Sequence, residues 1–167
     1  MLSSLVITFL PRSILSENVA STDTRFGLCS NLKERISRLC GRDVICTVAD
    51  AEPLGPKMPL ELLIICPCTG NTLAKLAHGI TDTAVTMAAK AHLRSDRPLV
   101  IALASNDALS ANLKNIGTVL TRKHVYFVPM QQDDPEKKPH SLVADFSLLM
   151  PTLQAAFSEK QFSKLFL

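Results

Sequence analysis

ICPCTGNTLAKLAHGITDTAV, residues Ile65 to Val85, joins the end of an apolar run to a helical pattern through a turn of small polar residues. The run Leu60–Cys66 is continuous rather than alternating, which is typical of a strand buried on both faces of a parallel sheet. After the turn Thr69–Asn71, apolar residues recur at helical spacing. A buried strand that turns at once into a helix is how α/β proteins place a polar ligand at a helix N-terminus. The stretch therefore predicts both a fold class and a site.

Similar runs rich in Val, Ile and Leu recur along the chain and alternate with helical patterns. We expect further strands at Leu5–Leu10, Val44–Val48, Leu99–Ala104 and His124–Val128. We expect further helices over about 30–40, 83–93, 106–117 and 141–157, the last bent or broken at Pro151. This alternation predicts a three-layer, doubly wound α/β fold with a mostly parallel sheet. At 167 residues, the chain fits a single domain spanning 1–167.

Ligands of such sheets bind at the carboxyl ends of the strands, so the residues that follow each strand are the candidates for a site. Three exits are rich in polar side chains: Ser21–Thr24, Thr69–Asn71 and Ser105–Asp107. Gly70 lets a ligand approach the backbone, while Thr69 and Asn71 offer a hydroxyl and an amide. Capping of the following helix explains Thr69 and Asn71 equally well. The residues alone leave both interpretations open.

Composition disfavours several functional classes. The net charge is +3 with one Tyr and no Trp, and no basic run is interleaved with aromatics, which argues against nucleic acid as a partner. The apolar run near the N-terminus is too short for a membrane span or a signal segment, so we expect a cytoplasmic protein without a membrane partner. The cysteines are five in number, and Cys66 and Cys68 have no further Cys or His pair nearby, so we expect a reducing compartment and no metal site.

Two longer motifs resemble a known family. The stretch PCTGNTLAKLAHGITDT (Pro67–Thr83) is similar to the Pro-Ala-Thr-Ala-Asn-Thr-x-x-Lys-x-Ala-x-Gly-x-x-Asp motif of the homo-oligomeric flavin-containing Cys decarboxylase family of flavoproteins. Downstream, RPLVIALASNDALSANL (Arg97–Leu113) resembles that family's Lys-Pro-Val-x-x-Ala-Pro-Ala-Met-Asn segment, with Asn106 at the position of the substrate-side Asn. Both motifs fall at strand exits marked above.

The resemblance implies a Rossmann-like, flavodoxin-like flavoprotein fold that binds FMN. Thr22, Thr69, Gly70 and Asn71 would then hold the flavin, and a further pair would face its ring or the substrate: Ser105 and Asn106. In the family a first strand ends in a Thr-Gly-Ser turn that contributes to the phosphate site. We find no counterpart of that strand in this chain and expect the sheet to lack it.

Further stretches resemble one branch of the family: STDTRFG (Ser21–Gly27), AEPLGPKMPLE (Ala51–Glu61) and YFVPMQQDDPEKKPHSLVA (Tyr126–Ala144). That branch implies oxidation of dihydrodipicolinate to dipicolinate in the mother cell of a spore-forming bacterium, beside a nicotinamide-dependent A subunit. A small dicarboxylate substrate and a homo-oligomer are implied as well. Lys137 and Lys138 in the charged loop would suit the dicarboxylate or the partner subunit.

Two alternatives stay open. One is a non-catalytic binding subunit that has lost its flavin. The other is an FMN-dependent cysteine decarboxylase, which in the family uses a His in the loop before the Thr-Ala-Asn strand, whereas the corresponding loop Asp50–Glu61 contains no His. His140, after the charged loop, is the one histidine kept as a site candidate, and no residue stands out as a general base, so the catalytic residues remain unknown.

Overall fold

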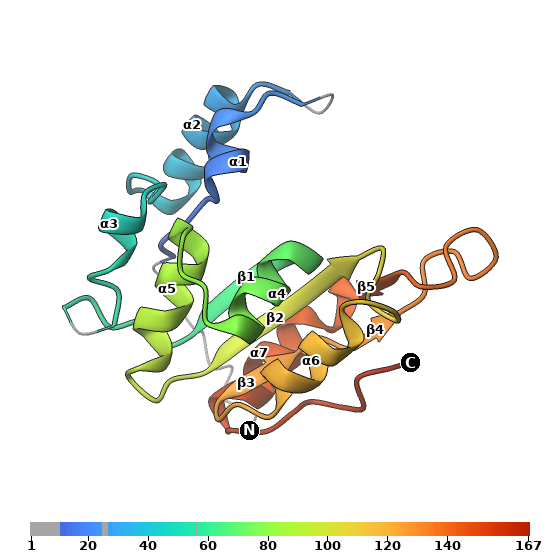
Figure 1. The fold of residues 1–167 in the computed structure, drawn as a ribbon. Helices are drawn as coiled ribbons and strands as arrows, with labels where there is room; N and C mark the ends of the chain where they lie inside the picture. Colours follow the sequence, from blue (N-terminus) through green and yellow to red (C-terminus); the bar gives the residue numbers. More distant parts are fainter. Residues whose placement is uncertain (1–10, 25–26, 56) are drawn as a thin grey trace, which may run out of the picture.

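The protein is described by a computed structural model covering residues 11–24, 27–55 and 57–167. Its centre is a mixed sheet flanked by helices (Figure 1). The strands among these residues are β1 (Leu63–Thr69), β2 (Leu99–Ser105), β3 (Val125–Phe127), β4 (Met130–Gln131) and β5 (Leu142–Ala144). The expected strand at Leu5–Leu10 lies outside the described residues.

The sheet is parallel in its first half and antiparallel in its second. β1 and β3 both pair with β2 in parallel, with Leu99 of β2 opposite Leu63 on one side and opposite Val125 on the other. The last residues of β2 pair antiparallel with β5, and β5 pairs antiparallel with β4. Because β1 occupies one edge of β2 along its length, β3 and β5 share the other edge, one after the other. The predicted α/β fold with a mostly parallel sheet is confirmed.

Helices cover the two faces of the sheet unequally (Figure 1). One face carries α4 (Gly70–His78), α5 (Ala84–Leu93) and α6 (Leu113–Leu120), and the other carries α7 (Leu149–Phe157). On the three-helix face, Ile65, Ile101 and Phe127 pack into one buried cluster. On the α7 face, Val100 and Tyr126 pack with Ala156 of α7 in a second cluster. These two apolar layers fix the sheet between the helices.

An arm formed by α1 (Glu17–Ser21) and α2 (Cys29–Cys40) extends away from the sheet (Figure 1). Neither helix contains a buried residue. α2 ends at Cys40, as predicted, and the following Gly41 has a φ of 62°, the left-handed conformation that glycine adopts readily. α3 (Val48–Ala51) follows and leads back to the body of the protein.

Three sequence predictions of secondary structure are wrong. The strand expected at Val44–Val48 is reduced to one isolated bridge between Ile45 and Ile14, since no neighbouring strand in the described part of the chain continues the pairing, and α3 begins at Val48. The helix expected over 106–117 is a series of turns up to Asn112, and α6 then continues through Gly117 to Leu120. The helix expected over 141–157 begins only at Leu149.

Long-range pairing explains the last of these errors. Leu142–Ala144 forms β5 because it fits between β2 and β4, an opportunity that local periodicity does not reveal. A 3-10 turn, Phe146–Leu148, then leads into α7. Pro151 causes no break, because it lies in the first turn of α7, where the backbone N–H has no intrahelical acceptor.

No helix in the described part of the chain is long and apolar enough to span a lipid bilayer.

Candidate functional site

A cavity of about 490 Å³ opens where β1 and β2 end side by side. The parallel register aligns Thr69, the last residue of β1, with Ala104 near the end of β2. The first turn of α4 lines one side of the cavity, and the turn after β2 lines the other. This is the carboxyl edge of the parallel strands, where α/β proteins bind their ligands.

Gly70 allows the two sides to come together. A Cβ atom at this position would lie 2.3 Å from the Ser105 hydroxyl oxygen and 2.6 Å from the Asn112 side-chain nitrogen. Both distances are far below van der Waals contact, so only glycine fits here without a shift of its neighbours. The sequence predicted a close approach at Gly70, and the approach that the structure describes is to Ser105 and Asn112.

Asp107 is the centre of a polar network on the β2 side of the cavity. Its carboxylate accepts a hydrogen bond from the Ser105 hydroxyl at 2.6 Å and two from the Asn112 amide at 2.8 and 2.9 Å. The Asn112 side-chain oxygen accepts in turn from the Asn115 amide at 2.8 Å. Ser105, Asn112 and Asn115 are all buried, so these bonds satisfy polar groups that water reaches poorly.

The same hydrogen bonds set the charge of the cavity. Donation from Ser105, and then from Asn112, lowers the pKa of the Asp107 carboxyl below its ordinary value. Asp107 is therefore ionised at neutral pH. A carboxylate repels a phosphate at this wall but accepts from N–H and O–H donors of a ligand. The first amides of α4 have no intrahelical acceptor and favour an anionic group, and an Asp107 carboxylate oxygen itself lies near them, 3.0 Å from the position of a Cβ atom on Gly70.

Five of the six predicted cofactor-binding residues line this cavity: Thr69, Gly70, Asn71, Ser105 and Asn106. The sixth, Thr22, lies apart from it at the end of α1, where its backbone N–H donates to the Asn18 carbonyl at 3.0 Å. His140 does not line the cavity either. It is exposed, and its carbonyl accepts from the Leu109 amide at 2.9 Å, which ties the charged loop to the turn beside the cavity.

Sequence reasoning missed the role of two residues. The sequence placed Asp107 among the polar residues of a strand exit without indicating a network around it, and gave no reason to single out Asn112. A Ser-Asn-Asp turn directly after a buried strand was the available signal for Asp107. Asn112 is five positions further on, and only the folded turn brings its amide to the carboxylate.

Helix capping is confirmed for Thr69, whose hydroxyl accepts from the Thr72 amide at 3.3 Å. Thr83, rather than the preceding Asp82, caps α5 and forms a capping box with Thr86. Asp82 is paired with Lys75, with 2.8 Å between the ammonium nitrogen and the carboxylate. The Lys and the Asp of the Lys-x-Ala-x-Gly-x-x-Asp motif thus bind one another across the end of α4.

Cys66 and Cys68 lie on opposite faces of β1. A shift of register between Ile65 and Cys68, at the cis Cys66–Pro67 peptide, places Cys68 in the core while Cys66 is exposed. Residues two apart on a regular strand share a face, so this shift of register is what separates the two thiols. Burial raises the pKa of the Cys68 thiol to about 12, so this thiol is neutral. Within residues 11–24, 27–55 and 57–167, no three His, Cys, Asp or Glu side chains gather closely enough to hold a metal ion.

Comparison with known proteins assigns this arrangement to a family. The model of the Flavoprotein family matches residues 47–145, which include both walls of the cavity. The B subunit of dipicolinate synthase from Bacillus subtilis (strain 168) is 44% identical over 150 residues, which is 90% of this chain and 75% of that protein.

Two solved structures resemble the fold. The crystal structure of the dipicolinate synthase B subunit from Bacillus halodurans has a TM-score of 0.83 and 38% identity, and the match covers 92% of this chain and 79% of that one. The FMN-dependent cysteine decarboxylase SpaF has a TM-score of 0.54 and 25% identity, over 74% of this chain and 71% of that one.

Proposed function

Because the chain belongs to the flavoprotein family, we propose that it is the flavin-binding B subunit of a dipicolinate synthase and takes part in the oxidation of dihydrodipicolinate to dipicolinate. The observation that carries this proposal is the 44% identity to the Bacillus subtilis protein over 90% of the chain. An alignment of 150 residues within a chain of 167 necessarily includes Thr69 to Asn112, so it spans the whole cavity.

FMN is the cofactor that we assign to the cavity. Because Gly70 has no side chain, the first turn of α4 can lie against the turn after β2. Together the two turns offer amides, hydroxyls and one carboxylate to a single ligand. Thr69, Gly70 and Asn71 would favour the anionic end of the cofactor beside the α4 N-terminus. Ser105 and Asn106 would face its ring or the substrate. Thr22 stays a prediction of the resemblance, since it lies outside this cavity.

A bound flavin supplies two-electron redox chemistry. The residues of the chain would orient the ring and the substrate. The Asp107 carboxylate would accept hydrogen bonds from N–H or O–H groups, because it remains ionised at neutral pH. The family and the dipicolinate synthase relatives support a role connected with an oxidoreductase.

Aromatisation of dihydrodipicolinate removes one hydride and one proton from the ring. A bound flavin, or a nicotinamide of the A subunit, would supply the acceptor for the hydride. Asp107 is a poor acceptor for the proton, because its hydrogen bonds lower the pKa of its carboxyl. It is also the one acidic side chain of the described residues that lines the cavity. We therefore assign proton removal to solvent or to the A subunit rather than to this wall.

We also propose that the chain forms a homo-oligomer and works in the mother-cell cytoplasm of a spore former. Large apolar side chains exposed on and beside the arm helices support self-association: Val19, Leu28, Leu32 and Leu39. In the charged loop, Lys138 forms an ion pair with Asp133, so Lys137 would be the lysine that contacts a dicarboxylate or the A subunit.

Flavin binding is tested by adding FMN to the purified chain, removing free FMN by desalting and recording the visible spectrum. We expect retained flavin bands near one FMN per chain. A chain that has its full fold by circular dichroism but no flavin bands would favour the non-catalytic binding subunit instead.

The reaction is tested by combining the chain with the A subunit and following dipicolinate formation from dihydrodipicolinate. We expect Asn106→Ala to lower the rate while Asn18→Ala on the exposed helix α1 leaves it unchanged. Equal rates with and without the chain would contradict a part in the oxidation. Release of CO₂ from a peptide with a C-terminal cysteine would instead favour a decarboxylase like SpaF.

A further inference from the structure

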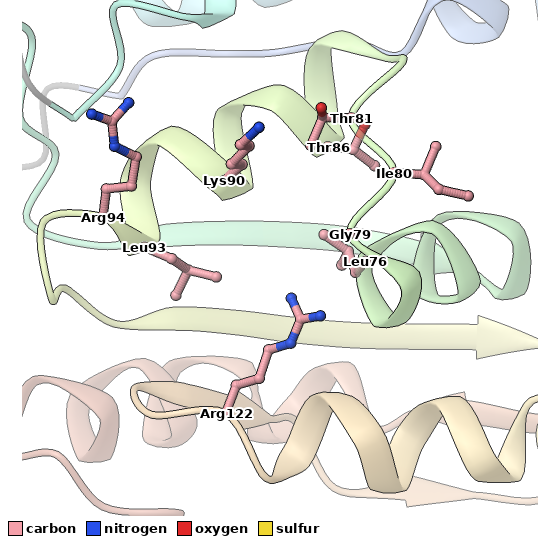
Figure 2. Close-up of a pocket in the computed structure, with 9 residues that line it drawn as sticks. All are labelled: Leu76, Gly79, Ile80, Thr81, Thr86, Lys90, Leu93, Arg94 and Arg122. Atoms are coloured by element: carbon pink, nitrogen blue, oxygen red, sulfur yellow. The ribbon is translucent and has the colours of Figure 1, made fainter.

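A second cavity, of about 330 Å³, lies on the three-helix side of the sheet, between the end of α4, the length of α5 and the turn after α6 (Figure 2). It shares no lining residue with the cavity at the strand ends. The proposed flavin chemistry therefore leaves it unused. Its volume is at the lower end of the range found for small-molecule sites.

The walls of this second cavity are apolar. Leu76 of α4 and Leu93 of α5 line it, and Ile80, just after α4, stands at its rim with 46% of its surface exposed. Thr86 also lines it, but its hydroxyl is already bonded to Thr83 in the capping box, at 2.8 Å. A ligand thus gains apolar burial from the walls and few hydrogen bonds from them.

Three cations surround these walls, and no carboxylate of the described residues lines the cavity. Lys90 and Arg94 are four residues apart along α5 and its C-terminal end, so they share a helix face and repel one another. Arg122 reaches from the turn after α6 toward the gap between Leu93 and Gly79 (Figure 2). It donates a hydrogen bond of 3.0 Å to the Ala77 carbonyl, which anchors its planar fork beside the cavity with further donors still available.

Some cations of the described residues are paired with carboxylates and others, including these three, are not. Arg38, Lys75, Arg97, Lys123 and Lys138 each lie within 4.0 Å of a carboxylate. Within the described ranges 11–24, 27–55 and 57–167, none of the three cations at the cavity forms such a pair. An apolar cavity lined by unpaired cations is complementary to an anion with an apolar body.

We propose that this cavity binds a small organic carboxylate, with its apolar body against Leu76, Ile80 and Leu93 and its acid group held by Arg122, while Lys90 and Arg94 add positive charge at the rim. The Arg122 fork matches the two oxygens of a carboxylate. An inorganic anion would satisfy the cations but would leave the apolar walls exposed to water. The inference rests on the second cavity alone and does not depend on flavin binding or on dipicolinate synthesis.

The test uses isophthalate, a benzene ring with two carboxylates, as the probe and inorganic phosphate as its comparison. The full chain is labelled at its Leu and Ile methyl groups, and each anion is titrated while the methyl signals are followed by NMR. We expect saturable shifts at Leu76, Ile80 and Leu93 with isophthalate and much weaker ones with phosphate. Equal responses to both anions would mean an adventitious ion site and would overturn the proposal.

The variant Lys90→Gln/Arg94→Gln tests the cations. Both side chains are exposed, so the fold is retained, and we expect isophthalate to bind about tenfold more weakly, since two positive charges at the rim of the cavity are lost. Arg35→Gln/Lys114→Gln removes the same charge from exposed positions of α2 and α6 and should leave binding unchanged. An equal loss of isophthalate affinity in both variants would mean that only net charge matters and would overturn the proposal. Methyl shifts confined to the cavity around Thr69 would overturn it as well.

Discussion

β1 and β2 are neighbouring parallel strands of similar apolar sequence, yet they are buried differently. Every residue of β2 is buried except Ala104, which is half-buried, whereas β1 alternates and leaves Cys66, Pro67 and Thr69 exposed. The difference lies in what covers the second face. α7 packs over β2 and β3, while Ile64 of β1 is only partly covered at the margin of that cluster. An apolar run thus predicts a strand, but the elements packed on each face decide its burial.

The largest expected effect separates these two strands. Ile101→Ala in β2 should lower the free energy of unfolding by about 3 kcal/mol, because a fully buried side chain is removed from a packed core. Ile64→Ala in β1 should lower it by about 1 kcal/mol, because that side chain is only half-buried. Urea unfolding at one fixed protein concentration measures both. Equal losses would mean that a second copy covers the open face of β1.

The second-largest effect compares alanine substitutions at two glycines: Gly70, at the exit of β1, and Gly117 in α6, which has no close neighbours. Gly70→Ala should cost about 2 kcal/mol, because the new methyl group would overlap the Ser105 hydroxyl. It should also reduce FMN retention after desalting. Gly117→Ala meets no atom within 4 Å in α6 and should stabilise the protein by about 0.5–1 kcal/mol. Thermal unfolding measures the changes in stability, and the visible spectrum measures FMN retention. Full retention of FMN by Gly70→Ala would mean that this cavity is not the flavin site.

A smaller effect tests whether Thr69 acts as a cap, as a ligand or as both. Thr69→Ala should cost about 1 kcal/mol through loss of the bond to the Thr72 amide, and Thr69→Ser should restore it. Urea unfolding measures the cap, and FMN titration measures the ligand contact. Unchanged FMN affinity in Thr69→Ala would leave capping as the whole role of this hydroxyl.

The smallest effect concerns the exit of β2 and depends on pH. The pKa of Asp107 is lowered in the folded state, so folding favours the ionised carboxylate. This stabilisation is present above the unfolded pKa and is lost as the pH falls through the folded pKa. The wild type should therefore lose more stability between pH 7 and pH 3 than Asp107→Asn does. Urea unfolding at both pH values gives the difference, and identical pH dependence would contradict the network around Asp107.

The comparison of β1 with β2 also explains what the sequence predicted well. The runs that became β1, β2 and β3 and the helices after Thr69 and Thr83 are specified locally, by apolar spacing and by caps. The candidate residues Thr69, Gly70 and Asn71 followed from the position of one strand exit. The β2 exit was predicted less well, because its turns depend on the Asp107 carboxylate meeting Asn112, and β5 depends on pairing with strands far away in sequence.

The shared edge of β2 has a consequence for the order in which the protein folds as it is synthesised. Residues 63–105, which include both strand ends at the cavity, leave the ribosome before any residue of β3 or β5. The second edge of β2 then stays unpaired until residues 125–127 and 142–144 emerge, and Ser105 gains its partner, Leu142, only at that stage. Such late, non-local pairing slows folding. The newly made chain thus presents an unpaired edge of the largely apolar strand β2 for the time needed to add about 40 residues, and this interval is when chaperones would act on it.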